Sequence, residues 1–401
     1  MGSNLSLEKT IDKVLEKNRS EILQNLKNSL TESQEKLSAS LKDLEQEYDK
    51  IILEGQKEAD KIDAVSVSTP DHAHAVQAMA AMQLGKHVYV QKPLTHDIYE
   101  ARKLTEAAKK YKVVTQMGIQ GHTKEGMRLL KEWIDAGAIG TVREIIYWTD
   151  RPIWPQGIGR PSGTPAVPKN VNWELWLGPA PKRPYHPAYH PFKWRGFWDF
   201  GTGAVGDMGC HNSDLAYWAL NLRDPKTLEA VSSGINDETA PKWSIITYHF
   251  PQQGKRKPVK VIWYDGGKKP DPALAEQKSL PGNGSILIGS KDSLYIPMYW
   301  GKGTFLSGAT EADFKNVPET IEKPTDFNRH HYLEWIDACK GGKPAWSNFD
   351  YAGPMTEAML LGLVALRSGK KIEWDPKKMR VKNAPEANRY IHSEYRKGWV
   401  L

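Results

Sequence analysis

The amino-acid composition of the chain changes sharply near residue 60, and this change most constrains how the chain can fold. Residues 1–60 contain no proline, no tryptophan and a single aromatic residue, Tyr48. All 26 prolines lie at Pro70 or later, and all 15 tryptophans lie at Trp133 or later. Lysines and arginines number 9 against 13 aspartates and glutamates up to residue 60, but 46 against 35 beyond it. Because such different compositions rarely share one compact core, we predict two separate parts.

The first part, residues 1–60, has the apolar periodicity of one long amphipathic helix. Its apolar residues also recur every eleven positions, which corresponds to about 3.67 residues per turn and favours a right-handed supercoil. A narrow apolar stripe of this kind needs a coiled-coil partner, although an ordinary helix lying on a domain is the alternative. The three rows are Leu15, Leu26, Leu37, Tyr48 and Ala59; Ile11, Ile22 and Leu44, interrupted by Ser33; and Leu30, Leu41 and Ile52.

In periodicity and charge pattern, this segment resembles the N-terminal helix of the E-type peripheral-stalk subunit of archaeal and vacuolar rotary ATPases. Its first residues, MGSNLSLEKT, lack the apolar stretch of a signal peptide. A cytoplasmic location is therefore the default expectation.

The second part opens with alternating strand and helix patterns. DAVSVST (63–69), KHVYVQKP (86–93) and KVVTQMG (112–118) have the β-branched, apolar character of strands. The segments between them have helical periodicity, with Asp71 as the expected cap of the first helix and Thr95 or Asp97 as the cap of the second. Such an alternation predicts a parallel sheet with helices on both faces. Ligands of these sheets bind beyond the carboxyl ends of the strands, here Thr69–His72, Gln91–Pro93 and Gln116–Gln120.

After residue 121 the pattern changes again. One helix and a long strand, GTVREIIYWTDR, precede a loop-rich stretch that extends to about residue 200. The later segments WSIITYHF, VKVIWYD, GSILIGS and SLYIPMYW have the spacing of hairpins, so we predict a mostly antiparallel sheet. A final helix should end at Gly369.

Three glycines, Gly201, Gly203 and Gly206, have the spacing of a dinucleotide-binding turn. Such a turn follows a strand and opens a helix. The preceding residues, WRGFWDF, make a poor strand of a parallel sheet, whereas the following residues do have a helical pattern. We therefore interpret these glycines as the open start of a helix and not as the cofactor turn.

The helix after these glycines carries a candidate catalytic pair. Asp207 and His211 are four residues apart and share one helical face. The carboxylate could orient the histidine as a general acid or base, although a capping aspartate beside a structural histidine is the alternative. Lys92, at the carboxyl end of a predicted strand, could hold a substrate hydroxyl and favour its alkoxide, unless it is a surface lysine.

Residues 61–401 resemble the Gfo/Idh/MocA family of nicotinamide-dependent oxidoreductases. The segments that carry the resemblance occur in order: STPDHAH (68–74), GKHVYVQKPL (85–94), TQMGIQG (115–121), GDMGCHNSD (206–214) and SNFDYAGPMTE (347–357). RPIWPQG (151–157) and WRGFWDFGTGAVGDMGCH (194–211) are similar to a bacterial branch of this family. The resemblance implies a Rossmann domain followed by a domain built on a large, mostly antiparallel sheet.

The resemblance also implies residue roles. Lys92 matches the lysine of the family's Glu-Lys-Pro motif, with Gln91 in place of the glutamate, and Asp207 with His211 match its Asp-x-x-x-His pair. Thr69, Pro70 and His74 match residues that line the cofactor, NAD or NADP. From their places at the strand ends we add His72, Gln91, Lys92, Gln116 and Gly118 to the expected cofactor contacts.

One departure from the family is large. Its members begin with a strand and a genuine glycine-rich turn, and no such turn or ribose-binding acid precedes residue 61 here. We therefore expect an α/β chain composed of a long helix (1–60), the second half of a Rossmann domain (61–120) and a substrate domain (121–401). We interpret the chain as a fusion joined near residues 59–62, with an exposed, incomplete sheet edge.

The loop-rich stretch supplies candidate substrate residues. Aromatic faces and bidentate donors suit a sugar or polyol, although the same side chains could pack a sheet or a dimer face. The candidates are Gln120, Arg151, Trp154, Gln156, Tyr185, His190, Trp194 and Arg195. We also expect a homo-oligomer formed through the sheet face.

Several classes of function are disfavoured. The net charge of +7 is scattered, without the basic block typical of nucleic-acid binding. The two cysteines, Cys210 and Cys339, form no metal motif, and the His72–His74 pair has no third ligand. The longest largely apolar run, 358–366, is too short to span a bilayer.

Three functions remain open at this point. The first is an oxidoreductase of a sugar, cyclitol or related polyol, inactive if the missing half is essential. The second is an NAD-dependent glycosidase of the same superfamily, and the third is a non-catalytic coiled-coil assembly protein.

Overall fold

A computed structural model of the protein describes residues 2–298 and 301–401. The chain divides into two compact units, Met1–Asp63 and Ala64–Leu401. Each unit is described by itself. The last two residues of the segment SLYIPMYW, 299 and 300, lie outside the described residues.

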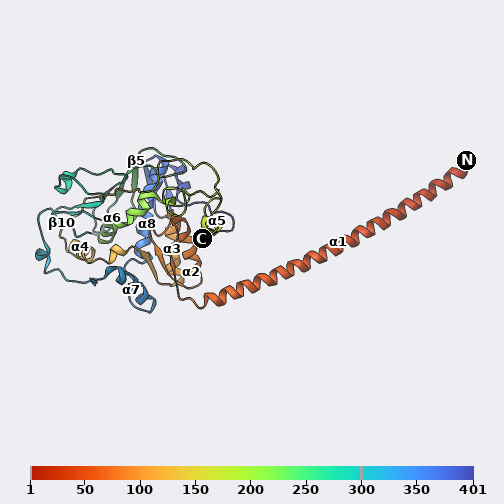
Figure 1. Ribbon diagram of the computed structural model, residues 1–401, viewed down its shortest axis with the longest axis horizontal. Coiled ribbons are helices and arrows are strands. Elements are labelled where there is room, and N and C mark those ends of the chain that lie inside the picture. The colour runs from red at the N-terminus through yellow and green to blue at the C-terminus, as the bar shows by residue number, and fades with distance from the viewer. Residues whose placement is uncertain (1, 299–300) are drawn as a thin grey trace. The chain divides into compact units, whose positions relative to one another are not determined.

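The first unit consists of one helix, α1 (Gly2–Ala59), which is continuous over 58 residues (Figure 1). Its sequence contains no proline and many leucines, lysines and glutamates, which have high helix propensity. Leu26, Leu30, Leu37 and Leu41 are between 55% and 64% exposed, so the apolar rows of this stretch have no cover within the chain. The predicted long N-terminal helix is confirmed.

The second unit begins with a small parallel sheet in the order β1-β2-β3. These strands span Ala64–Val67, His87–Gln91 and Thr115–Gly118, and they are joined by α2 (Asp71–Gln83) and α3 (Ile98–Tyr111). Both strand pairs are parallel, as predicted from the alternating pattern. Asp97 caps α3 and forms a capping box with Glu100, which confirms one of the two expected caps. Within the described residues β1 pairs on one side only and is an edge strand.

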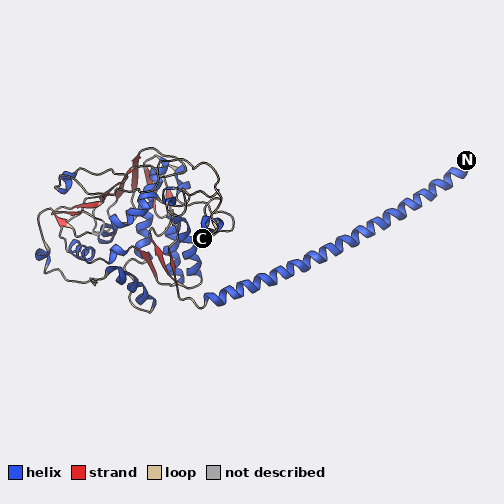
Figure 2. Cartoon of the chain, in the orientation of Figure 1, coloured by secondary structure: helices blue, strands red, loops and turns tan. Residues whose placement is uncertain are grey.

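A nine-stranded sheet forms the larger layer of this unit (Figure 2). All its pairings are antiparallel except that between β4 and β7, so the prediction of a mostly antiparallel sheet is confirmed. Its strands, in spatial order, are β10 (Thr304–Phe305), β9 (Ser293–Ile296), β8 (Gly284–Ile288), β4 (Glu144–Trp148), β7 (Val259–Tyr264), β6 (Ser244–Phe250), β5 (Thr227–Ser232), β11 (Ile372–Asp375) and β12 (Arg380–Val381).

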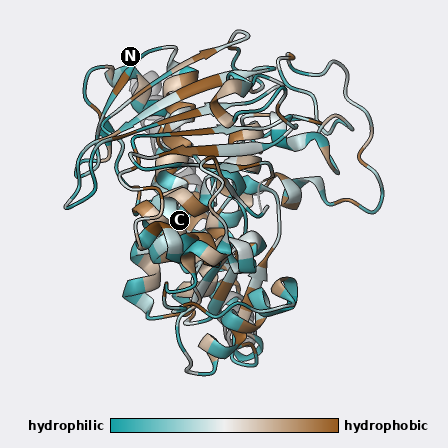
Figure 3. Ribbon diagram, turned by 90° about the vertical axis from the view of Figure 1, so that its left-hand side faces the viewer, coloured by the Kyte–Doolittle hydropathy of each residue, from teal (hydrophilic) through white to brown (hydrophobic). Residues whose placement is uncertain are grey.

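Strand β6 alternates strictly between buried and partly exposed residues, a period-two pattern that indicates one face on the core and one more exposed face. Strands β4, β8 and β9 are instead buried at almost every position, so both of their faces are covered. Figure 3 shows these strands side by side, with hydrophobic and hydrophilic residues interleaved along them.

The core between the two sheets is organised by α6 (Gly203–Leu220) and α8 (Phe349–Ser368), which contact one another. α8 also contacts α3 and β5, and so links the parallel sheet to the large sheet. It ends at Gly369 with φ of 63°, a left-handed conformation that glycine adopts readily, as predicted. The other α-helices are α4 (Glu125–Asp135), α5 (Trp173–Leu177) and α7 (Phe327–Cys339). None of the helices in the described part of the chain is long and apolar enough to cross a membrane.

Candidate active site at the start of α6

The glycine-rich turn at 201–206 opens α6 and brings it close to neighbouring chain segments. Gly203 has φ of 62°, and no strand precedes the helix, so the turn lacks the strand-turn-helix setting of a dinucleotide fingerprint. A Cβ atom on Gly206 would lie 1.7 Å from Thr202 Oγ1 and 3.4 Å from Pro93 Cγ. The glycines therefore permit close packing of α6 against the end of β2.

This packing places Lys92 against Asp207. Lys92 Nζ lies 2.8 Å from Asp207 Oδ1 and donates a second hydrogen bond to the Asp207 carbonyl oxygen at 3.0 Å. Both side chains are largely buried, with 16% and 12% exposed. Burial alone would raise the pKa of the Asp207 carboxyl, but Lys92 and Arg195 outweigh it and hold that pKa below its usual value. Asp207 is therefore an anion at neutral pH.

A second carboxylate, Asp71, continues this chain of charges. Arg195 lies between the two carboxylates, with Nη1 2.9 Å from Asp71 Oδ1 and Nε 3.4 Å from Asp207 Oδ1. Asp71 Oδ2 accepts hydrogen bonds from Thr202 Oγ1 at 2.6 Å and from the Thr202 amide at 3.1 Å. The expectation that Asp71 caps α2 is wrong, because Pro70 is the N-cap and no side chain caps that helix. The carboxylate instead binds the turn that opens α6.

His211 lies one turn beyond Asp207 on α6 and is buried. Burial, together with the nearby Lys92 ammonium, lowers the pKa of His211 to about 3. The imidazole is therefore neutral at neutral pH. Cys210 beside it is an inert thiol, because burial raises its pKa to about 12.

The other residues expected near the cofactor divide into two groups. Thr69 and Pro70 are half-buried at the carboxyl end of β1. His72 and His74 are almost fully buried, and each ring contacts two backbone carbonyl oxygens. Burial lowers the pKa of both rings, to about 4 for His72. These two histidines tie α2 to neighbouring loops.

The ends of β2 and β3 form a polar cluster. Gln91 Nε2 donates to the Gly118 carbonyl oxygen at 3.2 Å, and Gln120 Nε2 lies 3.3 Å from Tyr89 Oη and 3.2 Å from Tyr332 Oη. Gln91 and Gln120 remain half-buried at this edge.

Gln116 has a different position from Gln91 and Gln120. It is fully buried, and its amide donates to the His331 carbonyl oxygen at 2.7 Å. Its side chain therefore fixes the helix α7 against the strand β3. The sequence patterns had not predicted α7.

Four of the expected substrate residues lie within or beside the charged cluster that Lys92, Asp207 and Asp71 form with Arg195: Trp154, Gln156, Trp194 and Arg195 itself. The Arg195 guanidinium lies over the rings of Trp194 and Trp154, at 4.4 and 5.8 Å from their centroids. Trp154 Nε1 donates to Gln156 Oε1 at 2.9 Å, and Gln156 Nε2 donates to the Pro241 carbonyl oxygen. Gln156 is therefore a buried support for Trp154.

The remaining three expected substrate residues have other contacts. Arg151 pairs with Asp150 at 2.6 Å. Tyr185 packs edge-on against Trp173 in a buried aromatic cluster, and His190 lies edge-on to Trp176. For Tyr185 the alternative interpretation holds, because this side chain packs in the protein interior.

Asp71 and Thr202 are the members of the charged cluster whose contacts the sequence did not reveal. Asp71 and Arg195 are 124 positions apart, and no local pattern links them. Among the described residues no group of three or more His, Cys, Asp or Glu side chains could hold a metal ion.

Two models of one oxidoreductase family match the chain. The model of its NAD-binding Rossmann fold matches residues 2–119, and the model of its C-terminal alpha/beta domain matches residues 154–274. Together they cover more than half of the chain.

Curated relatives include sugar and inositol enzymes. The chain is 33% identical to levoglucosan dehydrogenase of Pseudarthrobacter phenanthrenivorans over 40% of its own length and 33% of the relative's. It is 33% identical to scyllo-inositol 2-dehydrogenase (NAD(+)) of Bacillus subtilis over 26% of its length and 28% of the relative's. The chain thus matches only about a third of the length of these relatives.

Solved structures share the fold. A WlbA dehydrogenase from Chromobacterium violaceum, in complex with NADH and UDP-GlcNAcA, superposes with a TM-score of 0.53, 16% identity and 78% coverage of each chain. A levoglucosan dehydrogenase in complex with NADH and levoglucosan superposes with a TM-score of 0.51 at 16% identity, covering 79% of this chain and 82% of the other.

The match to an NAD-binding Rossmann model makes NAD or NADP the expected cofactor. The ordered motifs, the paired sheets and the two family models agree on one assignment. The chain belongs to the Gfo/Idh/MocA family of oxidoreductases.

Proposed function

We propose that the protein is an NAD(P)-dependent oxidoreductase of a sugar, cyclitol or related polyol. The observation that carries this proposal is the buried Lys92–Asp207 pair with the neutral His211 one turn further along α6. Family membership and the sugar and inositol enzymes among the relatives support the substrate class.

Each of the three residues has a distinct role in this proposal. Oxidation of an alcohol removes a hydride from the carbon and a proton from its hydroxyl group. NAD(P), when bound, supplies the hydride acceptor. Lys92 donates a hydrogen bond to the hydroxyl oxygen and stabilises the developing alkoxide. His211, whose ring is neutral, accepts a hydrogen bond from the hydroxyl group and is the proposed acceptor of its proton, and Asp207 orients the Lys92 ammonium.

The residues present fit the nicotinamide end of the cofactor better than its pyrophosphate. Thr69, Pro70 and Lys92 lie at the carboxyl ends of parallel strands, where such ligands bind. Residues 2–59 lie inside the stretch matched by the Rossmann model, yet they fold as one helix and supply no strand and glycine turn. We propose that this half of the nucleotide site is missing, and that cofactor affinity is weak for that reason.

A steady-state assay tests the reaction. The purified full chain is incubated with NAD or NADP and a panel of sugars and inositols, and NADH or NADPH formation is followed. Net reduced cofactor with at least one polyol supports the proposal. Sugar release from a glycoside without net reduced cofactor would support the glycosidase alternative instead.

Titration calorimetry with NAD alone separates cofactor loss from a wrong substrate choice. Weak but measurable binding is expected. No heat at millimolar cofactor would contradict the proposal for this chain and favour the third function, a non-catalytic assembly protein.

We make a second proposal for α1. Its leucines are exposed between residues 23 and 44, and its composition differs from that of the rest of the chain. We propose that residues 1–60 are a separate coiled-coil segment, joined to the oxidoreductase near residues 59–62, that binds a partner helix. Exchanging Leu26 and Leu37 for glutamate, both in one eleven-residue row, should reduce self-association or partner capture in sedimentation velocity. Unchanged sedimentation of a chain that does associate would contradict this role.

A further inference from the structure

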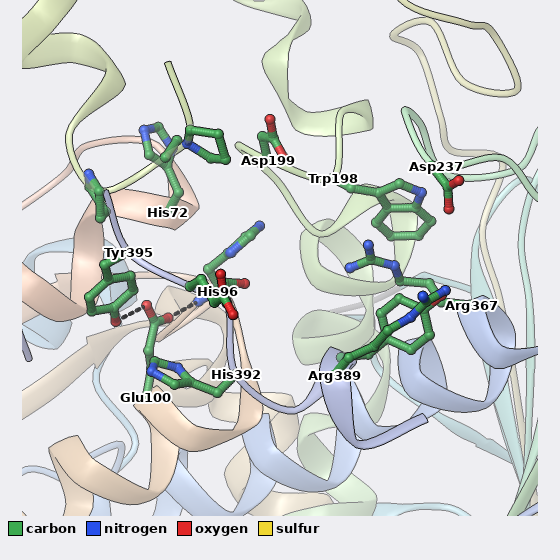
Figure 4. Close-up of a pocket in the computed structure, with 16 residues that line it drawn as sticks. His72, His96, Glu100, Trp198, Asp199, Asp237, Arg367, Arg389, His392 and Tyr395 are labelled. Atoms are coloured by element: carbon green, nitrogen blue, oxygen red, sulfur yellow. Dashed lines mark hydrogen bonds between the residues drawn. The ribbon is translucent and has the colours of Figure 1, made fainter. Parts of the chain in front are cut away.

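A cavity of about 460 Å³ lies apart from the Lys92–Asp207 pair (Figure 4). It is bounded by the N-terminal ends of α2 and α3, the C-terminal end of α8, the short helix Pro385–Tyr390 and the chain that follows it. Lys92, Asp207 and His211 are not among the residues that line it. The family match and the relatives assign nothing to this cavity.

Arg367, near the end of α8, is the main positively charged residue on the wall of the cavity. Its guanidinium lies between two rings, 4.8 Å from the centroid of Trp198 and 4.3 Å from that of Tyr390. Trp198 is itself fixed, because its Nε1 donates to the Asn236 carbonyl oxygen at 3.1 Å. The carboxylates of Asp199 and Asp237 act on this guanidinium electrostatically, but among the described residues neither forms a hydrogen bond or ion pair with it. A guanidinium that is held in place and has no hydrogen-bond acceptor of its own is suited to bind the oxygen atoms of an anion.

A second arginine strengthens this preference. Arg389 donates to Tyr390 Oη, and its guanidinium lies 4.7 Å from the centre of that ring. Figure 4 shows Arg367 and Arg389 on the same side of the cavity. Two guanidinium groups on one wall suit a carboxylate or a phosphate.

Acidic side chains on the lining discriminate between these anions. Asp237 and Glu394 line the cavity, with Asp237 close enough to Arg367 and Arg389 to interact with both electrostatically, and Asp199 lines it while paired with Arg183. These carboxylates repel a ligand of high negative charge, but they can accept hydrogen bonds from hydroxyl groups. The lining therefore favours a single anionic group joined to hydroxyls over a phosphate dianion.

The opposite wall is polar but not strongly charged. Burial raises the pKa of the Glu100 carboxyl well above its usual value, and the neighbouring Asp97 adds to this effect. Tyr395 Oη donates to Glu100 at 2.6 Å, and His96 and His392 lie beside them, as Figure 4 shows. This wall offers donors and acceptors to hydroxyl groups.

We propose that this cavity is a second ligand site, for a small hydroxylated carboxylate such as a sugar acid. Arg367 and Arg389 bind the carboxylate, and the wall formed by Glu100, His96 and His392 faces the hydroxyl groups. The proposal goes beyond the dehydrogenase reaction and does not depend on it.

Calorimetric titration of the full chain with D-gluconate, D-glucose and inorganic phosphate tests the ligand class. Gluconate should bind, and glucose should bind at least about 10-fold more weakly, since it lacks the charged hydrogen bonds, which are each worth about that factor. Phosphate should also bind at least about 10-fold more weakly, because the carboxylates on the lining repel its higher charge. Absence of gluconate binding, or phosphate binding of equal strength, would overturn the proposal.

Variants then locate the bound gluconate. Arg367→Gln, which keeps a polar side chain but removes the guanidinium charge, should weaken binding about 10-fold or more, and Arg389→Ala should weaken it less because Arg389 is exposed. The matched control is Arg329→Ala, an exposed arginine outside the cavity, which should bind as the parent does. Thermal unfolding of each variant verifies that it is folded.

A fourth variant separates this site from the candidate active site. Lys92→Met should leave gluconate binding unchanged if the ligand occupies the cavity. Loss of binding in Lys92→Met with full binding in Arg367→Gln would place gluconate at the candidate active site and overturn the proposal, without bearing on the oxidoreductase reaction.

Discussion

Charges of opposite sign alternate along the buried cluster at the start of α6. Lys92 meets Asp207, Arg195 lies between Asp207 and Asp71, and Asp71 accepts from the Thr202 amide and hydroxyl. Each buried charge thus has an opposite charge or a hydrogen-bond donor beside it, which offsets part of its desolvation penalty. Removing one member leaves its neighbour unpaired, so single substitutions here have large and distinguishable effects.

Lys92→Met should abolish most of the proposed activity while the protein stays folded. The substitution removes the ammonium that holds the hydroxyl oxygen, and we expect kcat to fall by about 100-fold or more. The control is Lys343→Met, an exposed lysine, which should retain the parent kcat. Steady-state kinetics with the best polyol of the panel provide the measurement. A Lys92→Met enzyme with at least half of the parent kcat would exclude the proposed role.

Asp71→Asn should destabilise the protein through the same cluster. Asp71 is 1% exposed, and the substitution leaves the Arg195 charge with weaker pairing in a buried setting. We expect the free energy of unfolding to fall by about 3 kcal/mol in urea titrations. Asp350→Asn removes a surface ion pair with Lys109 at 3.0 Å and should change this free energy by less than about 1 kcal/mol. Equal effects of the two substitutions would show that burial of the Asp71 pair is energetically unimportant.

At the scale of elements, the parts of the fold that local periodicity encodes could be predicted from the sequence. The βαβ units, the antiparallel sheet and the end of α8 at Gly369 follow from hydrophobic spacing and glycine position. α7 was missed, because its hydrophobic pattern is weak and much of its surface is exposed. Lys92, Asp207 and His211 could be proposed from their motifs, but the contact between Asp71 and Arg195 joins distant segments that only tertiary packing unites.

The start of α6 packs so closely against the preceding turn that adding one methyl group there should destabilise the protein. Gly206→Ala would place a Cβ 1.7 Å from Thr202 Oγ1, and that hydroxyl is held by its hydrogen bond to Asp71. We expect the variant to lose about 2 kcal/mol or more in unfolding free energy, because overpacking forces the turn to shift.

Gly159→Ala is the matched control for this overpacking. A Cβ on Gly159 would meet no heavy atom within 4 Å, so its unfolding free energy should remain within about 0.5 kcal/mol of the parent. If Gly206→Ala were as stable as Gly159→Ala, the tight packing of the turn would not be a constraint on this helix.

At the scale of the whole molecule, histidines buried far apart share one electrostatic property. Burial lowers the pKa of His72 to about 4 and that of His331 to about 3, as it does for His211. In the unfolded chain a histidine titrates near 6.5, so below that pH the unfolded state binds protons that the native state does not. Buried carboxyls oppose this effect, because burial raises the pKa of Asp265 to about 6. A pH profile of the parent alone therefore mixes both contributions.

A variant of one histidine isolates its contribution. His331 is fully buried, its Nδ1 lies 2.9 Å from Thr123 Oγ1, and Gln116 Nε2 contacts its Nε2 at 2.9 Å. His331→Gln should be less stable than the parent at pH 7. As the pH falls from 6.5 to 4.5, only the parent loses the stability linked to this ring, at up to about 1.4 kcal/mol per pH unit. The stability gap between the two proteins should therefore narrow by about 2 kcal/mol, as measured by urea unfolding at both pH values. Leu104→Ala, a buried substitution without a titratable group, should show the same gap at both pH values. A His331→Gln gap that is equally independent of pH would mean that the pKa of this ring is not lowered in the native protein.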